Sequence, residues 1–327
     1  MQKLKILITG GAGYIGSHVL RLLGDTTNHE IVVVDNLETG REESILYGRH
    51  ENFDIGDIER LEELLKNEKF DACFHFAGSI IVPESVSDPI KYYKNNTVKT
   101  LCLIELCLKY NVNKFVFSST AAVYAQNDSG IYKEDDLIKP GNPYGKTKYM
   151  TEWMLEDISN AYPDFNYLIL RYFNVAGASL DGVIGQAGKT STHLVKIASE
   201  VAVGKRDKMY IYGEDYKTKD GTCIRDYIHV LDLADAHIKG LEYLFQKNES
   251  VVFNVGYNQG YSVHEVLNAM RQAMEHEIPA SISSRRPGDD AVLVANCDKI
   301  KSKLNWQPKY NDIKLICKTA ANWESKL

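Results

Sequence analysis

The hydrophobic residues in the first half of the chain form short, nearly continuous runs separated by longer amphipathic stretches. Five β-rich runs occur before residue 174: "LKILITG" (4–10), "EIVVVDN" (30–36), "ACFHFAG" (72–78), "KFVFSST" (114–120) and "YLILRYF" (167–173). Such runs are typical of strands that are buried on both faces, as in a parallel sheet covered by helices. Helical periodicity fills the stretches between them, over residues 14–24, 58–67, 89–110 and about 144–160. This alternation predicts an α/β fold with a doubly wound parallel sheet.

After residue 174 the alternation becomes irregular, and the pattern predicts a smaller mixed α/β domain. A loop-rich stretch covers residues 175–190. The elements expected after it are helices near 191–203, 231–246 and 262–276, strands at 209–213, 251–256 and about 280–284, and a helical tail. We therefore expect a first domain over residues 1–174, with returns near 229–257. A second domain is expected over residues 175–228 and 258–327.

Composition and charge exclude several classes of protein. The 327 residues are 44% hydrophobic and 25% charged, which is ordinary for a globular protein. A net charge of −6 argues against general binding of nucleic acid. No apolar run is long enough to cross a membrane, and the N-terminus passes into a strand without a signal-peptide pattern. The scattered cysteines favour free thiols in a reducing cytoplasm, with no metal site: Cys73, Cys102, Cys107, Cys223, Cys297 and Cys317.

A glycine turn between the first strand and the first helix predicts a nucleotide site. Gly10, Gly13 and Gly16 in "TGGAGYIGSH" permit a tight turn, and the helix that follows offers N–H groups to a pyrophosphate. Asp35 ends the second strand, where a carboxylate can bind both ribose hydroxyls and repel a 2′-phosphate. The neighbouring residues offer no arginine for such a phosphate nearer than Arg41, so NAD is favoured over NADP.

Asp57, in "DIGDI", precedes the helix expected at residues 58–67. It has two interpretations of equal weight, because a carboxylate at this position can cap the helix or contact the adenine of the cofactor.

"PYGKTK" (143–148) places Tyr144 and Lys148 one helical turn apart, with Lys146 on another face. The fourth strand ends in the hydroxyls of Ser118, Ser119 and Thr120, at the sheet edge where ligands bind. We expect the Lys148 ammonium to lower the pKa of Tyr144 from about 10 toward neutrality, so that Tyr144 acts as a base. By itself Tyr144 would suit a half-buried aromatic at a helix start. The set of hydroxyls beside it favours catalysis.

These motifs resemble the extended short-chain dehydrogenase/reductase superfamily and, within it, the UDP-galactose 4-epimerase family. The resemblance runs from residue 4 to about 306 and rests on "TGGAGYIGSH", "HFAG", "SSTAAVY", "PYGKTK", "RYFN" and "GTCIRDYIHV…DLADAH". It implies a Rossmann domain that holds NAD and a smaller domain that binds a UDP-sugar. It also implies a homodimer, built from the helices near 89–110 and 144–160, that serves galactose and other carbohydrate metabolism.

The resemblance also implies roles for individual residues. Tyr144 would be the base, Lys148 its partner and a ligand of the nicotinamide ribose, and Thr120 the contact of the sugar 4-oxygen. The cofactor-binding residues would be Gly10, Gly13, Tyr14, Ile15, Gly16, Asp35, Asn36, Asp57, Ile58, Phe76, Ala77, Gly78, Asn95, Ser118, Tyr144, Lys148 and Tyr172. The substrate-binding residues would be Thr120, Asn174, His193, Leu194, Tyr210, Arg225, Tyr227, Arg286, Asp289 and Leu293.

Four positions depart from familiar members of this family. Thr120 stands where serine is common, and it keeps the hydroxyl. Ile80 replaces a lysine that contacts the cofactor pyrophosphate, and His193 stands where some relatives carry asparagine. Leu293 lies five positions after Gly288, where members that reject N-acetylated sugars carry a tyrosine. The smaller leucine predicts that UDP-GlcNAc and UDP-GalNAc are accepted together with UDP-Glc and UDP-Gal.

The implied reaction is reversible 4-epimerisation of a UDP-hexose through a 4-keto intermediate. A nucleotide-sugar 4,6-dehydratase is the first alternative, but its relatives carry Asp-Glu after the strand-end threonine, where this chain has Ala121 and Ala122. A catalytically inactive NAD-binding module is the second alternative. Such a protein would have no need of the pair Tyr144 and Lys148.

Overall fold

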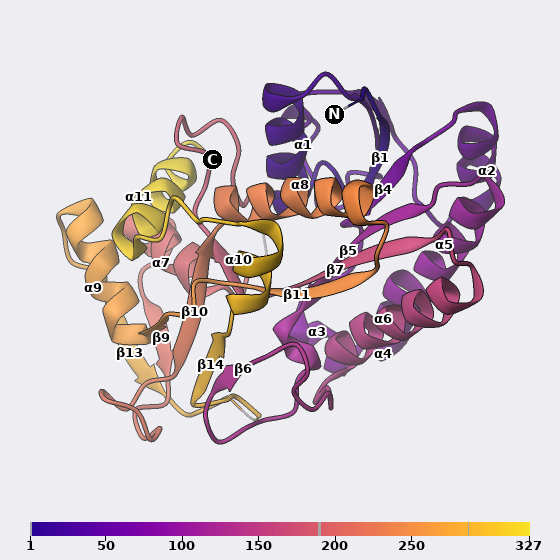
Figure 1. Cartoon of the computed structure of the whole chain (residues 1–327). Coiled ribbons are helices and arrows are strands. Elements are labelled where there is room, and N and C mark those ends of the chain that lie inside the picture. Colours follow the sequence, from indigo (N-terminus) through magenta and orange to yellow (C-terminus); the bar gives the residue numbers. More distant parts are fainter. Residues whose placement is uncertain (1, 189–190, 287) are drawn as a thin grey trace. The chain divides into compact units, whose positions relative to one another are not determined.

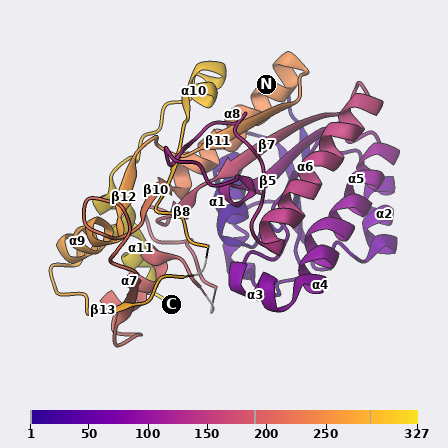
Figure 2. The ribbon, with the colours of Figure 1, turned by 90° about the horizontal axis from the view of Figure 1, so that it is seen from below.

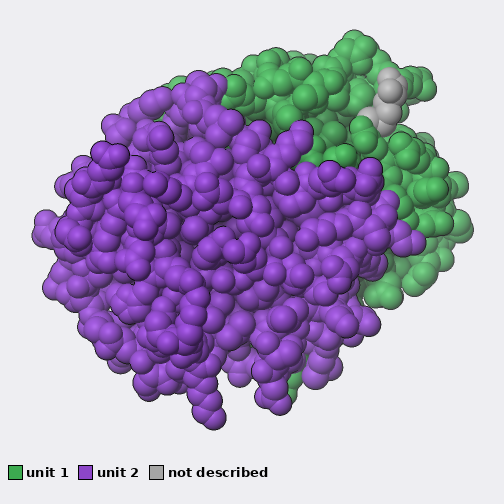
Figure 3. Space-filling view, turned by 60° about the vertical axis from the view of Figure 1, so that its left-hand side comes forward, with its two compact units in different colours: residues 1–123, 138–171, 234–253 green, residues 124–137, 172–233, 254–327 purple. Residues whose placement is uncertain are grey.

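The computed structural model describes residues 2–188, 191–286 and 288–327. The chain forms two compact units (Figure 3). Unit 1 comprises residues 1–123, 138–171 and 234–253, and unit 2 comprises residues 124–137, 172–233 and 254–327. The expectation that residues 124–137 belong to the first domain is wrong. This segment joins unit 2 because its short strand β6 (Ile131–Tyr132) pairs in parallel with β14 (Val292–Ala295).

Unit 1 is built on a seven-stranded sheet in the order β11-β7-β5-β4-β1-β2-β3 (Figure 1). The strands are β1 (Lys5–Thr9), β2 (Glu30–Val34), β3 (Arg49–Glu51), β4 (Ala72–His75), β5 (Lys114–Thr120), β7 (Asn166–Tyr172) and β11 (Val251–Val255). β1 pairs in parallel with β2 and with β4, and β2–β3 and β4–β5 are parallel too. This order confirms the predicted doubly wound sheet. The pattern of hydrophobic runs did not predict β3.

Helices cover both faces of this sheet, as Figures 1 and 2 show. One layer contains α2 (Ile58–Asn67), α5 (Lys99–Lys109) and α6 (Pro143–Ala161), and the other contains α1 (Tyr14–Thr26) and most of α8 (Val230–Lys247). The first layer buries Leu64, Leu103 and Leu155 in one core cluster with Phe115 of β5. On the opposite face, His237 of α8 lies 6.3 Å from the ring of Phe74. Alternating strand residues are therefore buried against both layers.

The helix expected at residues 89–110 is interrupted by a wider π-helical turn. α4 (Pro89–Tyr92) leads into η2 (Tyr93–Val98), a π-helix, and then into α5. Within η2 the Asn96 amide accepts a hydrogen bond from Ser79 N at 2.7 Å and donates one to the Thr147 hydroxyl at 3.2 Å. Asn96 thus connects the loop after β4 to helix α6, and π-turns of this kind are frequent at functional sites.

Unit 2 contains two smaller sheets. The larger has the order β12-β10-β14-β6, with β8 pairing β10, and the smaller joins β13 to β9. The strands not yet described are β8 (Asn174–Ala176), β9 (Met209–Tyr212), β10 (Ile224–His229), β12 (Gly260–Ser262) and β13 (Ala280–Ser283). The helices are α7 (Leu194–Ala202), α9 (Val263–Met274), α10 (Asp298–Leu304) and α11 (Ile313–Glu324). α7, α9 and α11 pack on one another. The predicted helices of this half are present, although the one expected near 191–203 begins at Leu194 and the one expected near 262–276 ends at Met274.

The remaining elements of unit 1 are short. They are η1 (Glu42–Ser44), α3 (Val82–Ser87) and η3 (Ala121–Val123). η3 follows β5 without a break and leads the chain out of unit 1 toward residues 124–137.

Candidate active site

The turn between β1 and α1 accepts only glycine at two of its predicted positions. Gly10 has φ +74°, and a Cβ there would lie 2.5 Å from Ala77 N. A Cβ on Gly16 would lie 2.3 Å from Gly10 O. Helix α1 begins at Tyr14, and Gly13 precedes it without any side-chain cap. Gly13 brings no capping side chain to the start of α1, and a helix start of this kind suits a bound pyrophosphate.

Asp35 is tied to this turn by its carboxylate. One oxygen accepts a hydrogen bond from Ala12 N at 2.9 Å, and the other accepts one from Leu37 N at 2.9 Å. Asn36, next along the chain, donates from its side chain to Asp54 at 3.0 Å. Asp35 is only half-buried, so its oxygens retain lone pairs that can accept further bonds beside the glycine turn.

Asp57 caps helix α2. Its carboxylate accepts a hydrogen bond from Arg60 N at 3.2 Å, and Ile58 is the first helical residue. Of the two interpretations of Asp57, the structure contains the cap. The adenine contact stays a prediction, because the second carboxylate oxygen of Asp57 can still accept a hydrogen bond from the cofactor.

The loop after β4 crosses the end of β1. The N–H groups of Phe76 and Ala77 both donate to Thr9 O, at 2.9 and 3.2 Å. Gly78 and Ser79 follow, and the Asn95 amide donates to the Ser79 hydroxyl at 2.9 Å. Ile80, at the position of the missing lysine, is 54% exposed. The residues predicted to bind the cofactor from this loop and from η2 therefore lie at one end of the sheet, beside the glycine turn.

Tyr144 and Lys148 are held against the end of β5 by the start of α6. Asn142 caps this helix by accepting from Gly145 N at 2.9 Å. A Cβ on Gly145 would lie 2.4 Å from Ala122 O, so glycine allows the helix to approach the chain after β5. Lys148 Nζ donates to the Ser118 carbonyl at 3.0 Å.

The Thr120 hydroxyl hydrogen-bonds the phenol of Tyr144. The predicted strand-end hydroxyl, the tyrosine and the lysine are thus together in unit 1.

Burial changes the proton affinities of this pair in opposite directions. Loss of solvent lowers the pKa of Lys148 to about 8, because burial disfavours the ammonium. Burial likewise raises the pKa of the Tyr144 phenol, and the hydrogen bond from Thr120 offsets part of this rise. The expectation that Lys148 lowers the pKa of Tyr144 is therefore wrong for the protein alone. The Lys148 ammonium is directed at the Ser118 carbonyl, and desolvation dominates.

Ser119 does not share the site with its neighbours. Its hydroxyl donates to the carboxylate of Glu152, and both side chains are buried. Because successive strand residues face opposite sides of a sheet, Ser119 points to the face opposite Ser118 and Thr120. The expectation that all three hydroxyls reach the site is wrong for Ser119.

In unit 2, three adjacent strands bring four predicted substrate residues into register. Asn174 of β8 pairs with Tyr227 of β10, and Arg225 of β10 pairs with Leu293 of β14. The guanidinium of Arg225, which is 9% exposed, donates to the Asp289 carboxylate at 2.5 Å. A buried arginine fixed in this way presents its remaining donors in a set direction, which suits a diphosphate.

Arg286 lies flat against an aromatic ring. Its guanidinium carbon is 4.0 Å from the ring centre of Tyr212 on β9. Tyr210, two residues earlier on the same strand, is 47% exposed. Tyr210 was predicted as a substrate residue and Tyr212 was not, although the period of two in "MYIYG" places both tyrosines on one face of the strand.

His193 and Leu194 lie where α7 begins. His193 occupies the cap position without capping the helix, because its Nδ1 is hydrogen-bonded to the side-chain amide of Gln186 at 2.9 Å. The Gln186 carbonyl accepts from Trp323 Nε1 at 3.1 Å, so the last turn of α11 supports this loop. No pattern in the sequence indicates Gln186, because its contact with Trp323 joins two segments 137 residues apart. Tyr172, assigned to the cofactor, is buried at the end of β7.

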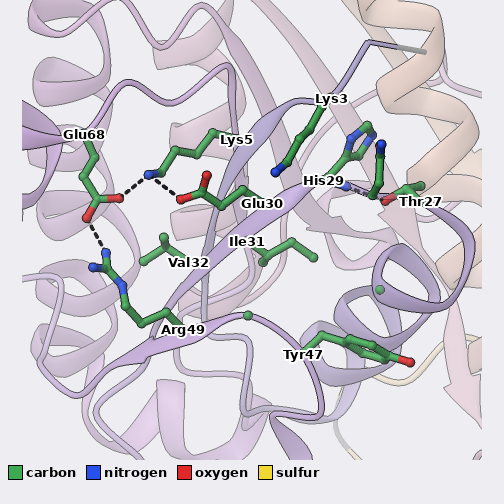
Figure 4. Close-up of a pocket in the computed structure, with 13 residues that line it drawn as sticks. Lys3, Lys5, Thr27, His29, Glu30, Ile31, Val32, Tyr47, Arg49 and Glu68 are labelled. Carbon is green, nitrogen blue, oxygen red and sulfur yellow. Dashed lines mark hydrogen bonds and ion pairs between the residues drawn. The ribbon is translucent and has the colours of Figure 1, made fainter.

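A separate hollow of about 580 Å³ lies at the amino ends of β1, β2 and β3 (Figure 4). Four of its charged residues pair with one another: Lys5 lies 2.6 Å from Glu30 and 2.7 Å from Glu68, and Arg49 also contacts Glu68. None of the predicted site residues lines it. The chemistry of the site is at the opposite ends of these strands, so we assign the hollow no role.

Within residues 2–188, 191–286 and 288–327, no three His, Cys, Asp or Glu side chains are grouped so that they could hold a metal ion. No helix among these residues combines the length and the apolar character needed to cross a bilayer.

Comparison with known proteins gives consistent matches. The model of the "NAD dependent epimerase/dehydratase family" matches residues 6–256. A UDP-glucose 4-epimerase of Azospirillum brasilense is 47% identical over 329 aligned residues, covering 99% of this chain and 92% of that protein. The structure of the UDP-Glc/GlcNAc 4-epimerase from Campylobacter jejuni is 50% identical with a TM-score of 0.88, covering 99% of this chain and all of that one. The Bifidobacterium longum UDP-glucose 4-epimerase, solved with NAD⁺ and UDP, is 35% identical with a TM-score of 0.91 and 98% coverage of each chain.

Proposed function

The chain belongs to the NAD dependent epimerase/dehydratase family, and on this premise we propose that it is an NAD-dependent UDP-hexose 4-epimerase. The observation that carries the proposal is the arrangement in unit 1 of Tyr144, Lys148 and Thr120. These groups suit proton transfer at a sugar hydroxyl. Lys148 Nζ also lies close to Gly78, in the loop that meets the glycine turn at Gly10. The family resemblance inferred from the sequence is confirmed.

NAD fits the residues at the end of the unit 1 sheet. The glycine turn has no room for side chains at Gly10 and Gly16, and the start of α1, which Gly13 precedes without a capping side chain, suits a pyrophosphate. Asp35 would accept hydrogen bonds from the adenosine ribose and disfavour the 2′-phosphate of NADP. When bound, the cofactor would accept a hydride from the sugar in its oxidised form and return it in its reduced form.

The side chains of unit 1 would handle the proton and position the sugar. Thr120 would bind the 4-oxygen, and Tyr144 would take the 4-hydroxyl proton and return it after the 4-keto sugar has turned over. Lys148, as an ammonium, would hold the nicotinamide ribose by donating hydrogen bonds to its hydroxyls. Proton and hydride both return to the same substrate, so no net oxidation occurs.

Unit 2 would bind the uridine diphosphate. The guanidinium groups of Arg225 and Arg286 suit the two phosphates, and Asn174 and Asp289 suit ribose or uracil edges. His193 and Tyr210, both exposed, would add contacts at the nucleotide. The preset geometry of Arg225, already held by Asp289, supports this assignment because less side-chain freedom is lost on binding.

We infer further that N-acetylated UDP-hexoses are substrates. Leu293 is half-buried and adjacent to Arg225 in the sheet, so its size would limit the space beside the diphosphate. The Campylobacter jejuni relative is named as acting on both UDP-Glc and UDP-GlcNAc. The 50% sequence identity of that relative to this chain supports the same set of substrates for this protein.

The 4,6-dehydratase reaction lacks the groups it needs. Ala121 and Ala122 follow Thr120 in η3, and neither can transfer a proton. The relatives reported above are epimerases by name, which supports the same choice.

A homodimer is part of the proposal. Large apolar side chains remain exposed on the outer layer of unit 1: Val98 is 54%, Leu101 45% and Trp153 52% exposed. Such side chains from η2, α5 and α6 would be covered by the same helices of a second copy. The six free cysteines support a cytoplasmic location, and UDP-galactose as a substrate supports a place in galactose metabolism.

The experiment is incubation of the purified protein with UDP-Glc, UDP-Gal, UDP-GlcNAc and UDP-GalNAc in separate reactions. We expect each sugar to be converted to its 4-epimer without net reduction of added NAD. Products that have lost water would favour a dehydratase, and bound NAD without turnover would favour an inactive module. Light scattering of wild type and Trp153→Glu, with the exposed Tyr162→Glu as control, tests the dimer face.

A further inference from the structure

An ion pair is buried between α6 and β7 in unit 1. Arg171 donates to Glu152 through Nη2 at 2.7 Å and through Nε at 3.1 and 3.2 Å. Both side chains are at most 6% exposed. The Ser119 hydroxyl donates to the same carboxylate at 2.5 Å, so one carboxylate joins β5, α6 and β7.

Such a pair is expensive to bury, because both charges lose their water and an apolar pair of similar volume is often as stable. Apolar packing already holds α6, since Leu155 is fully buried in the core cluster three residues later. What the ion pair adds is direction. Several charge-assisted bonds to one carboxylate fix the rotation and height of α6 on the strands more narrowly than Leu155 can.

The pair lies one helical turn from Lys148. Residues 148 and 152 share a face of α6, and they meet neighbouring residues of β5: Lys148 binds the Ser118 carbonyl and Glu152 binds the Ser119 hydroxyl. We propose that Glu152 is a positioning residue, which fixes α6 on β5 and so places Tyr144 and Lys148. Arg171 neutralises the negative charge of Glu152, so that this charge does not act on Lys148. The inference rests on the role proposed for Lys148.

The other titratable groups near Lys148 and Tyr144 are either neutral or bound to partners of their own. Burial and the nearby Lys148 lower the pKa of His75 on β4 to about 3, so His75 is uncharged at neutral pH. Burial also raises the pKa of Tyr92 on α4, and Glu84 of α3 is bound to Tyr92 and Lys91.

The contacts made by η2 and α5 near this site come from neutral side chains, Asn96 and Thr100. Glu152 is a carboxylate on the same face of α6 as Lys148, one helical turn away. Compensation of its charge by Arg171 therefore affects the electric field at Lys148.

The test is a pH titration of Lys148 itself, followed by NMR of protein with [¹³Cε]-lysine and assigned with Lys148→Arg. Arg171→Met leaves the carboxylate uncompensated, so the Lys148 midpoint should rise by about one pH unit. Glu152→Gln leaves the guanidinium uncompensated, so the midpoint should fall by a similar amount. In the double variant the Lys148 midpoint should lie within about 0.3 pH units of the wild-type value, since both charges are gone.

Arg171→Lys, which keeps the charge, is the matched control and should leave the midpoint near that of wild type. Glu152→Gln is nearly isosteric and carries the test alone if Arg171→Met does not fold. Shifts of the same sign in both single variants, or no shift in Glu152→Gln, would overturn the proposal. The titration needs no turnover, so a protein that titrates as expected yet converts no UDP-sugar would contradict the proposed function and leave this inference standing.

Discussion

The hydroxyl of Thr120 hydrogen-bonds the phenol of Tyr144, although Thr120 ends strand β5 and Tyr144 lies in the first turn of α6. The contact spans 24 residues of sequence, which include the excursion of residues 124–137 into unit 2. It joins a group that can hold a sugar oxygen to a group that can remove the proton from it. The following two predictions concern the two sides of this contact.

Tyr144→Phe is expected to lower kcat for UDP-Glc by 10²–10⁴-fold, the usual contribution of a general acid–base group. The ring remains, so binding of UDP by calorimetry should change little. Tyr149→Phe, on the same helix and packed at a tilt against Trp153, is the matched control. A Tyr144→Phe enzyme within about threefold of wild type would remove this residue from the role of base.

Thr120→Val is expected to move the acid limb of the kcat–pH profile to higher pH. The hydrogen bond from Thr120 lowers the pKa of Tyr144, so its loss raises that pKa and the base becomes deprotonated only in more alkaline solution. Thr120→Ser keeps the hydroxyl and should keep the limb where it is. Identical profiles for the valine and serine variants would contradict the contact.

Asp35→Ala is expected to weaken NAD binding by about tenfold or more, as hydrogen bonds to a charged group do, and to narrow the preference over NADP. Part of the loss has a structural origin, because the carboxylate also holds Ala12 N and Leu37 N. Asp35→Asn removes the negative charge and keeps one carbonyl oxygen, which can accept one of those two bonds. Titration of both cofactors into each variant separates the effects, and an unchanged NAD/NADP ratio in Asp35→Asn would show that the charge does not select the cofactor.

Leu293→Tyr is expected to exclude the N-acetylated sugars and to spare UDP-Glc and UDP-Gal. Overpacking a fitted site costs about 1–3 kcal/mol, roughly tenfold to over a hundredfold in rate. The measurement is kcat/KM for both pairs of substrates, in wild type and in the variant. Leu293→Met, of similar volume, is the control. Equal losses on both pairs, or a wild-type enzyme inert toward UDP-GlcNAc, would contradict the assignment.

His75 should make the protein less stable in weak acid. Its ring bridges the hydroxyls of Thr9, at 2.7 Å, and Thr100, at 2.8 Å, and burial lowers its pKa to about 3. The unfolded chain binds this proton near pH 6.5, so stability falls as the pH drops below about 6.5 and continues to fall toward 3.

His75→Gln should flatten this dependence. Between pH 7.5 and 5.5 it should remove about 1.4 kcal/mol of the decline in unfolding free energy, the linkage value for a shift of this size. Urea unfolding at the two pH values, against wild type and a surface His276→Gln control, measures the difference. Parallel stability curves for His75→Gln and wild type would mean that His75 binds its proton as readily in the folded chain as in the unfolded one.

The sheet and the main helices of unit 1 could be predicted because their residues form uninterrupted apolar runs and long periodic stretches. β3 and β6 could not, since three and two residues carry no period. The turn of η2 has the same composition as the α-helix around it, so its wider winding is visible only in the structure.

The site was predicted as a set of residue types, and its electrostatics were not. Ser119 could have been separated from Ser118 and Thr120 by strand alternation alone. The raised pKa of Tyr144 could not have been foreseen, because it depends on how much solvent the folded chain excludes. Glu152 and Arg171 look like ordinary surface charges in the sequence, and only packing reveals their burial.

The pairing of β6 with β14 also sets a timetable for biosynthesis. Ile131 pairs with Val294, and the ribosome must add about 160 residues between them. At 5–20 residues per second this takes on the order of 8–30 s. During that interval the segment between Thr120 and Tyr144 has no strand partner, even after most of the first sheet has emerged. Thr120 and Tyr144 therefore remain joined by a loop without its strand pairing until the chain is nearly complete. An incomplete nascent chain would have no finished active site.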